Sequence, residues 1–372
     1  MRCEPGDLGE TGARACGIAC GCGSRRAFLK SALALSASSA LSAPAVVLAQ
    51  APAAPPAAAP KPYRVDVHHH FFPPFLLEAW QKAALPNAPL VRNWTLGRTL
   101  EQMDQGGVAT AVLSIPTGLN LRDIDDAAIR RVTRLCNDFA AEAGKDHPGR
   151  FGLFALMPMP DIDGTLKEIE YTLDVIKADG IGLNTSYGNR WLGDPTFKPV
   201  LDELNRRRAI VYVHPLGPQC CNALMSYVPS SFVEYPQDTN RTVMSLLFSG
   251  AFARTRDIRW IFSHAGAAVP LLAGRVNALA KAQIKNMGEV LPEGIDFELK
   301  RLRYETANAA YAPNLAALLK YVPLSQVLFG SDYPYVGVVE NVTDLNNAGL
   351  STSELAAIER GNAVALMPRL QG

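Results

Sequence analysis

The stretch "YRVDVHHHFFPP" (residues 63–74) contains three of the six histidines of this 372-residue chain. The β-branched residues before the histidines predict a buried strand, and the prolines after Phe72 end it because proline cannot donate to a ladder. Side chains on a strand alternate between faces, so we expect His68 and His70 on one face and His69 on the other. Two imidazoles on one face are able to bind one metal ion. A polar strand end that meets solvent is the alternative.

Short apolar runs rich in β-branched residues recur after this stretch, and helical patterns separate them. The runs are almost continuously apolar, which is typical of parallel strands buried on both faces. Eight strand–helix units in roughly 300 residues predict an α/β fold, a (β/α)8 TIM barrel. An open doubly wound sheet is the competitor, but no Gly-rich dinucleotide fingerprint follows the first strand. We expect the strands at residues 63–70, 109–116, 151–159, 180–187, 209–215, 258–266, 302–310 and 327–334.

The N-terminal region reads as a targeting segment rather than as part of the barrel. Residues 24–30 ("SRRAFLK") closely match a twin-arginine export signal, and an Ala-, Leu- and Ser-rich stretch follows. That stretch is weakly hydrophobic and is interrupted by Pro44, so we expect no stable membrane anchor. Cleavage after Ala49 or Ala51 would release the chain into the periplasm.

This reading divides the chain into three parts. The first carries the signal, and the second is a linker of proline and alanine that has no means of packing. The predicted parts are the N-terminal extension at residues 1–51, the linker at 52–62 and the barrel at 63–372.

Composition narrows the possible functions. The chain is 48% hydrophobic and 19% charged, which suits a globular protein with a sizeable core. Its formal net charge is +1, and no basic block points to nucleic acid as a partner. The predicted mature chain keeps three cysteines, two of them adjacent, which do not make a disulfide framework. Its stability must therefore come from the core.

Polar residues gather where the predicted strands end. His68 and His70 end the first strand, His214 the fifth and His264 the sixth, and Asp332 follows the eighth. In a parallel barrel these ends meet at one mouth, so the five side chains should converge. Imidazole and carboxylate ligands suit a single divalent ion, for which we expect zinc, with manganese as the alternative. From the residues alone, Asp332 binds metal, carries a proton or does both, and His264 is a ligand or an acid–base group.

With these motifs in view, the chain resembles the amidohydrolase superfamily. Within it, the likeness is to the decarboxylase branch that includes aminocarboxymuconate semialdehyde, γ-resorcylate and 6-methylsalicylate decarboxylases. The likeness covers residues 63–368 and is strongest to the 6-methylsalicylate enzymes. It is carried by "VDVHHHFFPP", "VYVHPLG", "FSHAGAAVPLLAGR", "FGSDYPY", "RGNAVALM", "KADGIGLNTSYGNRWLGDPTFKPVLDELNRR" and "PQDTNRTVMSLLFSG".

The resemblance implies a role for each strand-end residue. One divalent ion is implied, and the catalytic acid–base group beside it would be His264, with Asp332 able to share that role. Binuclear members carry a bridging lysine at the end of the fourth strand, where this chain has Asn184, which favours a single metal. The implied metal ligands are His68, His70, His214 and Asp332.

The resemblance also implies a substrate contact and an assembly. Arg275 matches an arginine that, in the semialdehyde enzyme, reaches a substrate carboxylate across a dimer interface. A salt bridge on a helix surface is the alternative for this residue. We therefore expect a homodimer or a higher homo-oligomer.

The expected function is non-oxidative, metal-dependent decarboxylation of a small aromatic carboxylate that bears a neighbouring hydroxyl, similar to 6-methylsalicylate. No organic cofactor is required. A metal-dependent hydrolase is the first alternative, for example a lactonase acting on an aromatic-degradation intermediate, with His264 as the base. A non-catalytic periplasmic protein that binds a metal or a ligand is the second.

Overall fold

The computed structural model describes four stretches of the chain, residues 63–82, 91–116, 125–221 and 224–371. All of them belong to one compact unit, Ala59–Gly372. The predicted signal at residues 1–51 and the linker at 52–62 lie outside the described residues. Among the helices of the described stretches, none is both long and apolar enough to cross a bilayer.

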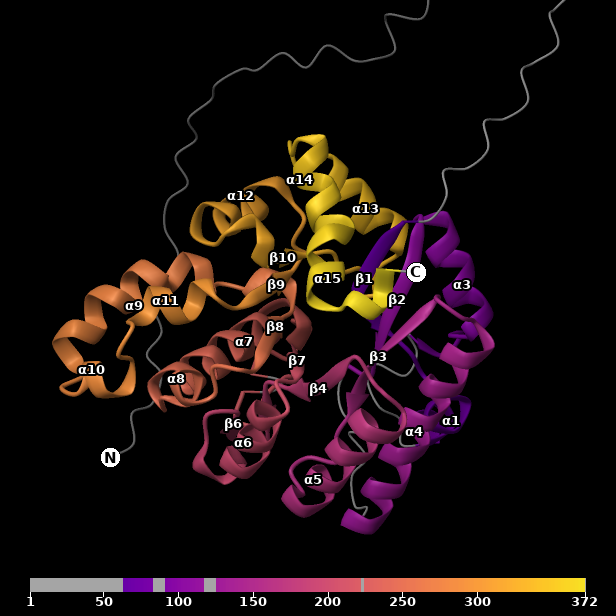
Figure 1. The fold of residues 1–372 in the computed structure, drawn as a ribbon, viewed down its shortest axis with the longest axis horizontal. Helices are drawn as coiled ribbons and strands as arrows, with labels where there is room; N and C mark the ends of the chain where they lie inside the picture. Colours follow the sequence, from indigo (N-terminus) through magenta and orange to yellow (C-terminus); the bar gives the residue numbers. More distant parts are fainter. Residues whose placement is uncertain (1–62, 83–90, 117–124, 222–223, 372) are drawn as a thin grey trace, which may run out of the picture. The chain divides into compact units, whose positions relative to one another are not determined.

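All eight predicted strands are present, and they form one parallel sheet in chain order. A short hairpin, β5 (Ser186–Tyr187) with β6 (Arg190–Trp191), follows the fourth strand of this sheet. The eight strands lie at the centre of the unit, with helices around them (Figure 1). They are β1 (Arg64–His70), β2 (Val108–Ser114), β3 (Phe151–Leu156), β4 (Gly180–Asn184), β7 (Ile210–His214), β8 (Arg259–Phe262), β9 (Arg303–Glu305) and β10 (Val327–Leu328).

The sheet closes on itself where β1 meets the segment that follows β10. His69 and Tyr333 form a parallel bridge. The Val67 N–H donates to the Phe329 carbonyl at 3.0 Å, and the His70 N–H donates to the Tyr333 carbonyl at 2.8 Å. This closure makes the fold a (β/α)8 barrel, as predicted, and excludes the open doubly wound sheet.

The helices cover the outside of the barrel and face it with apolar side chains. Asp125 caps the start of helix α4, and its carboxylate accepts from the Ala128 N–H at 2.6 Å. The helices are α1 (Pro74–Lys82), α3 (Leu96–Gln105), α4 (Asp126–Asp146), α5 (Ile162–Glu170), α6 (Lys198–Arg206), α7 (Ser230–Phe248), α8 (Ala251–Arg254), α9 (Val269–Gln283), α10 (Met287–Val290), α11 (Ile295–Lys300), α12 (Ala312–Tyr321), α13 (Val338–Asn346), α14 (Thr352–Ala356) and α15 (Asn362–Leu366).

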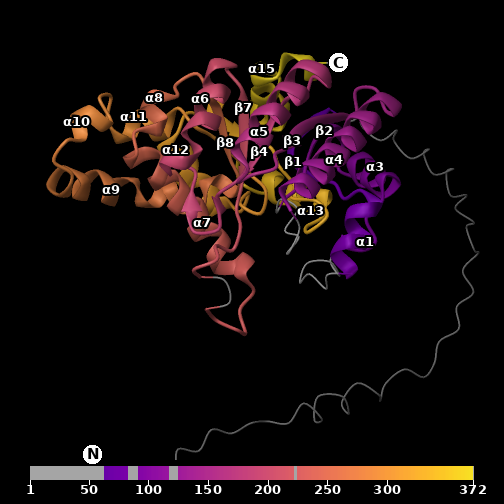
Figure 2. The same ribbon diagram turned by 90° about the horizontal axis from the view of Figure 1, so that it is seen from below.

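The interior of the barrel is apolar towards the amino ends of its strands. One buried cluster joins side chains from six strands to the C-terminal segment of the chain. In Figure 2, α15 lies on one side of the strands, and α1 and α13 lie on the other. The C-terminal segment therefore covers one end of the barrel and leaves the carboxyl ends of the strands for the site. The cluster comprises Val65, Val67, Val112, Phe154, Ile210, Tyr212, Ile261, Leu328, Ala363, Leu366, Met367 and Leu370.

A β-bulge in β1 decides which way the first two predicted ligands point. Asp66 pairs with Ala111 and His69 pairs with Leu113, so three steps along β1 match two steps along β2. Strict alternation would put His68 and His70 on the face opposite Val65 and Val67. The extra residue instead turns both histidines into the same interior that holds the valines, as bulges beside active sites commonly do.

The segment between β7 and α7 differs from expectation. The sequence suggests that residues 219–236 form one long loop over the pocket, but α7 begins at Ser230 and includes Pro236. Pro236 is the seventh residue of the helix and lies beyond its first turn, so α7 lacks the backbone hydrogen bond that an N–H at this position would donate. The connection to α7 is therefore shorter than predicted.

Candidate metal centre

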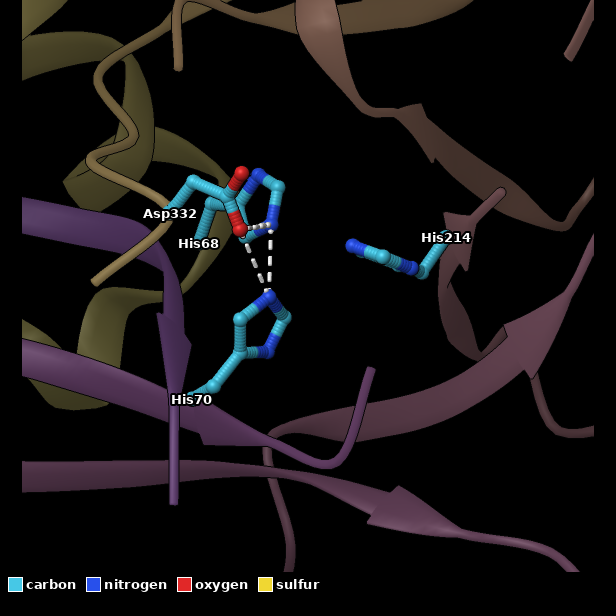
Figure 3. Close-up of side chains that lie close together, drawn as sticks. All are labelled: His68, His70, His214 and Asp332. Atoms are coloured by element: carbon cyan, nitrogen blue, oxygen red, sulfur yellow. Dashed lines mark hydrogen bonds and ion pairs between the residues drawn. The ribbon is translucent and has the colours of Figure 1, made fainter. Parts of the chain in front are cut away.

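Four predicted ligands converge at the mouth of the barrel. His68, His70, His214 and Asp332 are buried, and one donor atom from each lies within 4.8 Å of all the others. The Oδ1 atom of Asp332 is 2.9 Å from Nε2 of His70 and 3.1 Å from Nε2 of His68. In Figure 3, the ring of His214 faces this group from the opposite side. The ligands come from β1, β7 and the segment after β10, so the barrel brings together residues far apart in sequence.

The hydrogen bonds of the three rings test whether a metal fits. Each Nδ1 atom points away from the centre towards an acceptor: Glu305 Oε1 at 2.8 Å for His68, the Ser114 carbonyl at 3.2 Å for His70 and the Pro215 carbonyl at 2.9 Å for His214. An Nδ1 atom that donates carries the proton of a neutral ring. Each Nε2 atom then keeps a lone pair that points inward.

Those inward lone pairs need a cation. The Nε2 atoms of His68 and His70 lie 3.0 Å apart. The Nε2 atom of His214 is buried and has no hydrogen-bond partner among the described residues. A divalent ion satisfies all three nitrogens and the Asp332 carboxylate at once, and three imidazoles with one carboxylate suit zinc or manganese. The donor set therefore fits one divalent ion.

The pKa values of the three ligand histidines also favour a bound metal ion. Burial lowers the pKa of His70 to about 4 and lowers that of His214 well below its ordinary value, so both rings are neutral and able to bind metal. Burial also opposes protonation of His68, but the carboxylates of Glu305 and Asp332 outweigh it and raise its pKa to about 10. The negative charge of the two carboxylates therefore stabilises a cation at His68, either a proton on its ring or a metal ion bound to it.

The second oxygen of Asp332 faces a different set of groups. Its Oδ2 atom accepts from the Asn308 side-chain amide at 2.6 Å and lies 3.4 Å from Nε2 of His264. Burial would raise the pKa of Asp332, but the positive charge of His68 and hydrogen bonds from the histidines hold it well below its usual range. One carboxylate therefore faces the metal ligands with one oxygen and the predicted acid–base histidine with the other.

The backbone at these strand ends is strained. Asp332, His264 and Asn308 have φ values of 60°, 53° and 54°, in the left-handed region that residues other than glycine seldom adopt. Each follows the end of a different strand, β10, β8 and β9. Strain of this kind persists where the surrounding structure fixes it, and it clusters at functional sites.

The third histidine of the opening run has a partner network outside the barrel lumen. Nδ1 of His69 lies 2.9 Å from Oδ2 of Asp66, and its ring stacks on Tyr333 with centroids 4.8 Å apart. The Asp66 carboxylate also accepts from the backbone N–H of His68 at 3.0 Å and from the N–H and hydroxyl of Ser331 at 3.1 and 2.6 Å. We call Asp66, His69 and Ser331 the seam clasp, because they join the two chain segments that carry His68 and Asp332.

Sequence reasoning missed Glu305, Asn308 and the seam clasp. Glu305 ends β9 and is fully buried, and its carboxylate contacts His68 and the backbone of His264. A signal was available, because Glu305 is the one acidic residue in the predicted strand "LRYETANAA". Asn308 lies in the same run, three residues further on.

Two other predicted residues lie away from the ligand cluster. Arg275 is exposed on α9, outside the group of four ligands, and its role as a substrate contact stays a prediction. Asn184, at the strand end where binuclear members carry lysine, donates its side-chain amide to the Pro116 carbonyl at 2.7 Å.

The β5–β6 hairpin is fixed beside the mouth by a buried aspartate. Asp238 of α7 accepts from the Thr185 hydroxyl at 2.5 Å, the Ser186 hydroxyl at 2.8 Å and the Trp191 indole at 2.6 Å. A buried carboxylate with three donors is well satisfied. The hairpin after β4 is therefore held rigidly against α7.

The fold and the ligand set define the class: this is a (β/α)8-barrel protein with a metal centre of three histidines and one aspartate. The profile of the amidohydrolase family matches residues 65–369, and the chain belongs to that family.

The relatives are consistent with this family. The chain is 33% identical over 319 residues to a 6-methylsalicylic acid decarboxylase of Aspergillus aculeatus, an alignment that covers 83% of this chain and 97% of the relative. It is 31% identical over 316 residues to a 6-methylsalicylic acid decarboxylase of Penicillium expansum, with coverage of 83% and 97%.

A solved structure shares the fold. The 5-carboxyvanillate decarboxylase of Novosphingobium aromaticivorans, crystallised with manganese and 4-hydroxy-3-methoxy-5-nitrobenzoic acid, superposes with a TM-score of 0.74 at 19% identity. The superposition covers 82% of this chain and 96% of that one.

Proposed function

We propose that the protein is a metal-dependent decarboxylase that removes the carboxyl group of a small hydroxylated aromatic acid, similar to 6-methylsalicylate, without an oxidant. The observation that carries the proposal is the double contact of Asp332, which faces His68 and His70 with one oxygen and His264 with the other. Relatives that are decarboxylases of 6-methylsalicylic acid support the choice of substrate class.

Each residue has a task in this reaction. His68, His70, His214 and Asp332 would hold one divalent ion, which when bound supplies positive charge to bind and polarise substrate oxygens. The side chain of His264 is 19% exposed, so its ring is accessible from the mouth while its Nε2 atom stays near Asp332. The pair is placed to hold a proton and deliver it to the ring carbon that carries the carboxylate.

The proton transfer balances the reaction. The carbon that bears the carboxylate gains a proton from the His264–Asp332 pair. The bond from that carbon to the carboxylate then breaks, its electron pair restores the aromatic ring, and carbon dioxide leaves. Asn308 donates to the Oδ2 atom of Asp332 and so holds this carboxylate in place during the transfer.

For the metal we propose zinc, with manganese as the alternative. Histidine nitrogens and a carboxylate oxygen accommodate either ion. The Novosphingobium aromaticivorans decarboxylase contains manganese, which supports the alternative. Metal analysis of protein purified without added metal decides between the two ions, and we expect one ion per chain.

The test is a panel of hydroxybenzoates, with 6-methylsalicylate first, assayed for carbon dioxide release. We expect turnover of an acid that has a hydroxyl beside its carboxylate, and loss of at least about 100-fold in kcat for His264→Asn. Tyr321→Phe, which changes a side chain outside the site, is the control. Ring opening of lactones without release of carbon dioxide would instead support the hydrolase alternative.

The cell compartment is a separate proposal. We propose that the chain is exported to the periplasm by the twin-arginine route, on the strength of "SRRAFLK" at residues 24–30. Replacing both Arg25 and Arg26 by lysine should keep the protein in the cytoplasmic fraction. Equal periplasmic yields of the variant and the natural sequence would refute this route.

Assembly is also proposed rather than observed. A homodimer or higher homo-oligomer would allow the exposed Arg275 to reach a substrate carboxylate in a neighbouring copy. Arg275→Gln should then raise KM at least tenfold, a larger effect than Lys281→Gln on the same helix. A monomeric mass in solution would remove the basis for this role.

A further inference from the structure

The strand end of β9 provides no metal ligand, yet it carries a fully buried carboxylate, Glu305. The carboxylate has three donors: Nδ1 of His68 at 2.8 Å, the backbone N–H of His264 at 2.7 Å and the backbone N–H of Ala307 at 2.6 Å. Within the described residues, no lysine or arginine forms an ion pair with it, and its one basic side-chain partner is His68. A buried carboxylate of this kind directs its charge at the site.

One oxygen of this carboxylate serves two functional residues. Oε1 accepts both from the ring of His68 and from the backbone of His264, whereas Oε2 accepts from Ala307. The first bond fixes the tautomer in which Nε2 of His68 keeps its lone pair for a metal. The second bond holds the backbone of His264 at its strained φ of 53°.

The other two ligand histidines have no such partner. Nδ1 of His70 lies near the carbonyl and hydroxyl of Ser114, and Nδ1 of His214 lies near the carbonyl of Pro215. Neutral acceptors orient a ring but add no charge to it. A carboxylate partner raises the basicity of its ligand, so His68 should be the most strongly polarised of the three.

The space beside the Glu305 carboxylate is bounded by Gly330, where a side chain would collide with it. A Cβ atom added at Gly330 would lie 2.1 Å from Oε2 of Glu305 and 2.8 Å from Cβ of His68. A Cβ atom essentially never lies this close to another non-bonded heavy atom. The absence of a side chain at position 330 therefore permits the close approach of the carboxylate to the histidine.

We propose that Glu305 is a positioning residue that couples the metal ligand His68 to the acid–base residue His264. The part that concerns His264 rests on the proposed decarboxylation, whereas the part that concerns His68 does not. Removing the charge of Glu305 should weaken metal binding and misplace the proton-transfer group at the same time.

The test compares Glu305→Gln with Glu298→Gln. Glu298 of α11 is also a fully buried glutamate, but it accepts from Arg256, which follows α8, and from Arg301 at the end of α11, and it contacts none of the four ligands. Manganese affinity is measured by EPR titration of the chelator-stripped protein, a measurement that needs no turnover. Decarboxylation is then followed at saturating manganese, and circular dichroism reports whether each variant is folded.

We expect Glu305→Gln to bind manganese about 10- to 100-fold more weakly, the range typical of such partners. We also expect kcat at saturating manganese to fall, because the His264 backbone loses a charged acceptor. Glu298→Gln should bind manganese with the affinity of the natural sequence. Should Glu305→Gln fail to fold, Glu305→Asp keeps the charge with a shorter reach, and its affinity should fall by about tenfold.

Unchanged manganese affinity in a folded Glu305 variant would overturn the proposal. Weaker affinity with an unchanged kcat at saturation would refute the coupling to His264. If the natural sequence turns over none of the acids, the proposed function fails, but the manganese titration still decides whether Glu305 acts on His68.

Discussion

The two halves of the barrel interior are built on opposite principles. Towards the amino ends of the strands, Val65, Phe154 and Ile261 pack with the C-terminal segment in an apolar cluster. Towards the carboxyl ends, the buried side chains are histidines and carboxylates that need partners. Apolar burial stabilises the fold, whereas buried polar groups cost free energy unless they are paired. We call these regions the apolar half and the mouth, and infer that stability resides mainly in the first and function in the second.

The largest predicted effect is a loss of activity, and it should follow from a substitution in the mouth that leaves the apolar half unchanged. Asp332→Asn removes an anionic ligand and the partner of His264, so we expect kcat to fall on the order of 10³-fold or more. In the presence of a chelator, the loss of stability measured by thermal unfolding should be smaller than for a cavity in the apolar half, because Asp332→Asn weakens the contacts of the carboxylate with His68, His70 and Asn308 but removes no apolar packing. A large loss of chelated stability together with measurable activity would show that the two halves are not separable in this way.

The converse change breaks the apolar half. Phe154→Ala leaves a cavity beneath Tyr212, on which the Phe154 ring stacks with centroids 5.2 Å apart. We expect the free energy of unfolding to fall by about 3–5 kcal/mol. The folded fraction should still bind one metal ion per chain. Denaturant titration gives the stability, and metal analysis checks the site. Leu279→Ala on α9, where the side chain is 38% exposed, is the control and should change the stability by less than about 1 kcal/mol.

The seam clasp joins β1 to the segment after β10, where the barrel closes, so damage to it should affect both the stability and the metal centre. Asp66→Asn replaces an anion that accepts from His68, His69 and Ser331 with a neutral amide. We expect stability to fall by about 2 kcal/mol, since hydrogen bonds to a charged group are stronger than neutral ones. Metal affinity should fall as well, because the clasp fixes the backbones of His68 and of the residue before Asp332. A loss of stability alone would limit the clasp to a structural role.

The mouth should also be the acid-sensitive half. The pKa of His70 is lowered by burial to about 4, so between pH 6.5 and 4 the unfolded chain binds a proton that the folded chain does not. The stability of the chelated protein should therefore fall as the pH is lowered through this range, by roughly 1–2 kcal/mol at pH 5. Denaturant titrations at pH 7 and pH 5 measure the slope. His70→Gln should show a smaller slope, and an equal slope would assign the acid sensitivity to other groups.

The smallest effect concerns the boundary between the halves. Tyr212 stacks on Phe154, and its hydroxyl is buried with no hydrogen-bond partner among the described residues. Tyr212→Phe removes that hydroxyl, so we expect stability to be unchanged or raised by about 1 kcal/mol. A loss of more than about 1 kcal/mol, measured by denaturant unfolding, would show that the hydroxyl has a partner in solution.

The sequence alone determined the barrel and the four ligands. The apolar runs gave all eight strands, and the strand-end positions of His68, His70, His214 and Asp332 placed them at one mouth. Such inferences succeed because strand periodicity is local and because parallel strands bring their carboxyl ends together.

The direction in which those ligands point, and the groups that support them, depend on the folded barrel. The bulge that turns His68 inward appears only in the pairing of β1 with β2. Glu305 lies 237 positions from His68, and Ser331 lies 265 positions from Asp66. Local pattern carries no information about which distant strand end will supply a partner. The ligands could therefore be predicted from the sequence. The groups that hold them in place could not, because they come together only when the barrel closes.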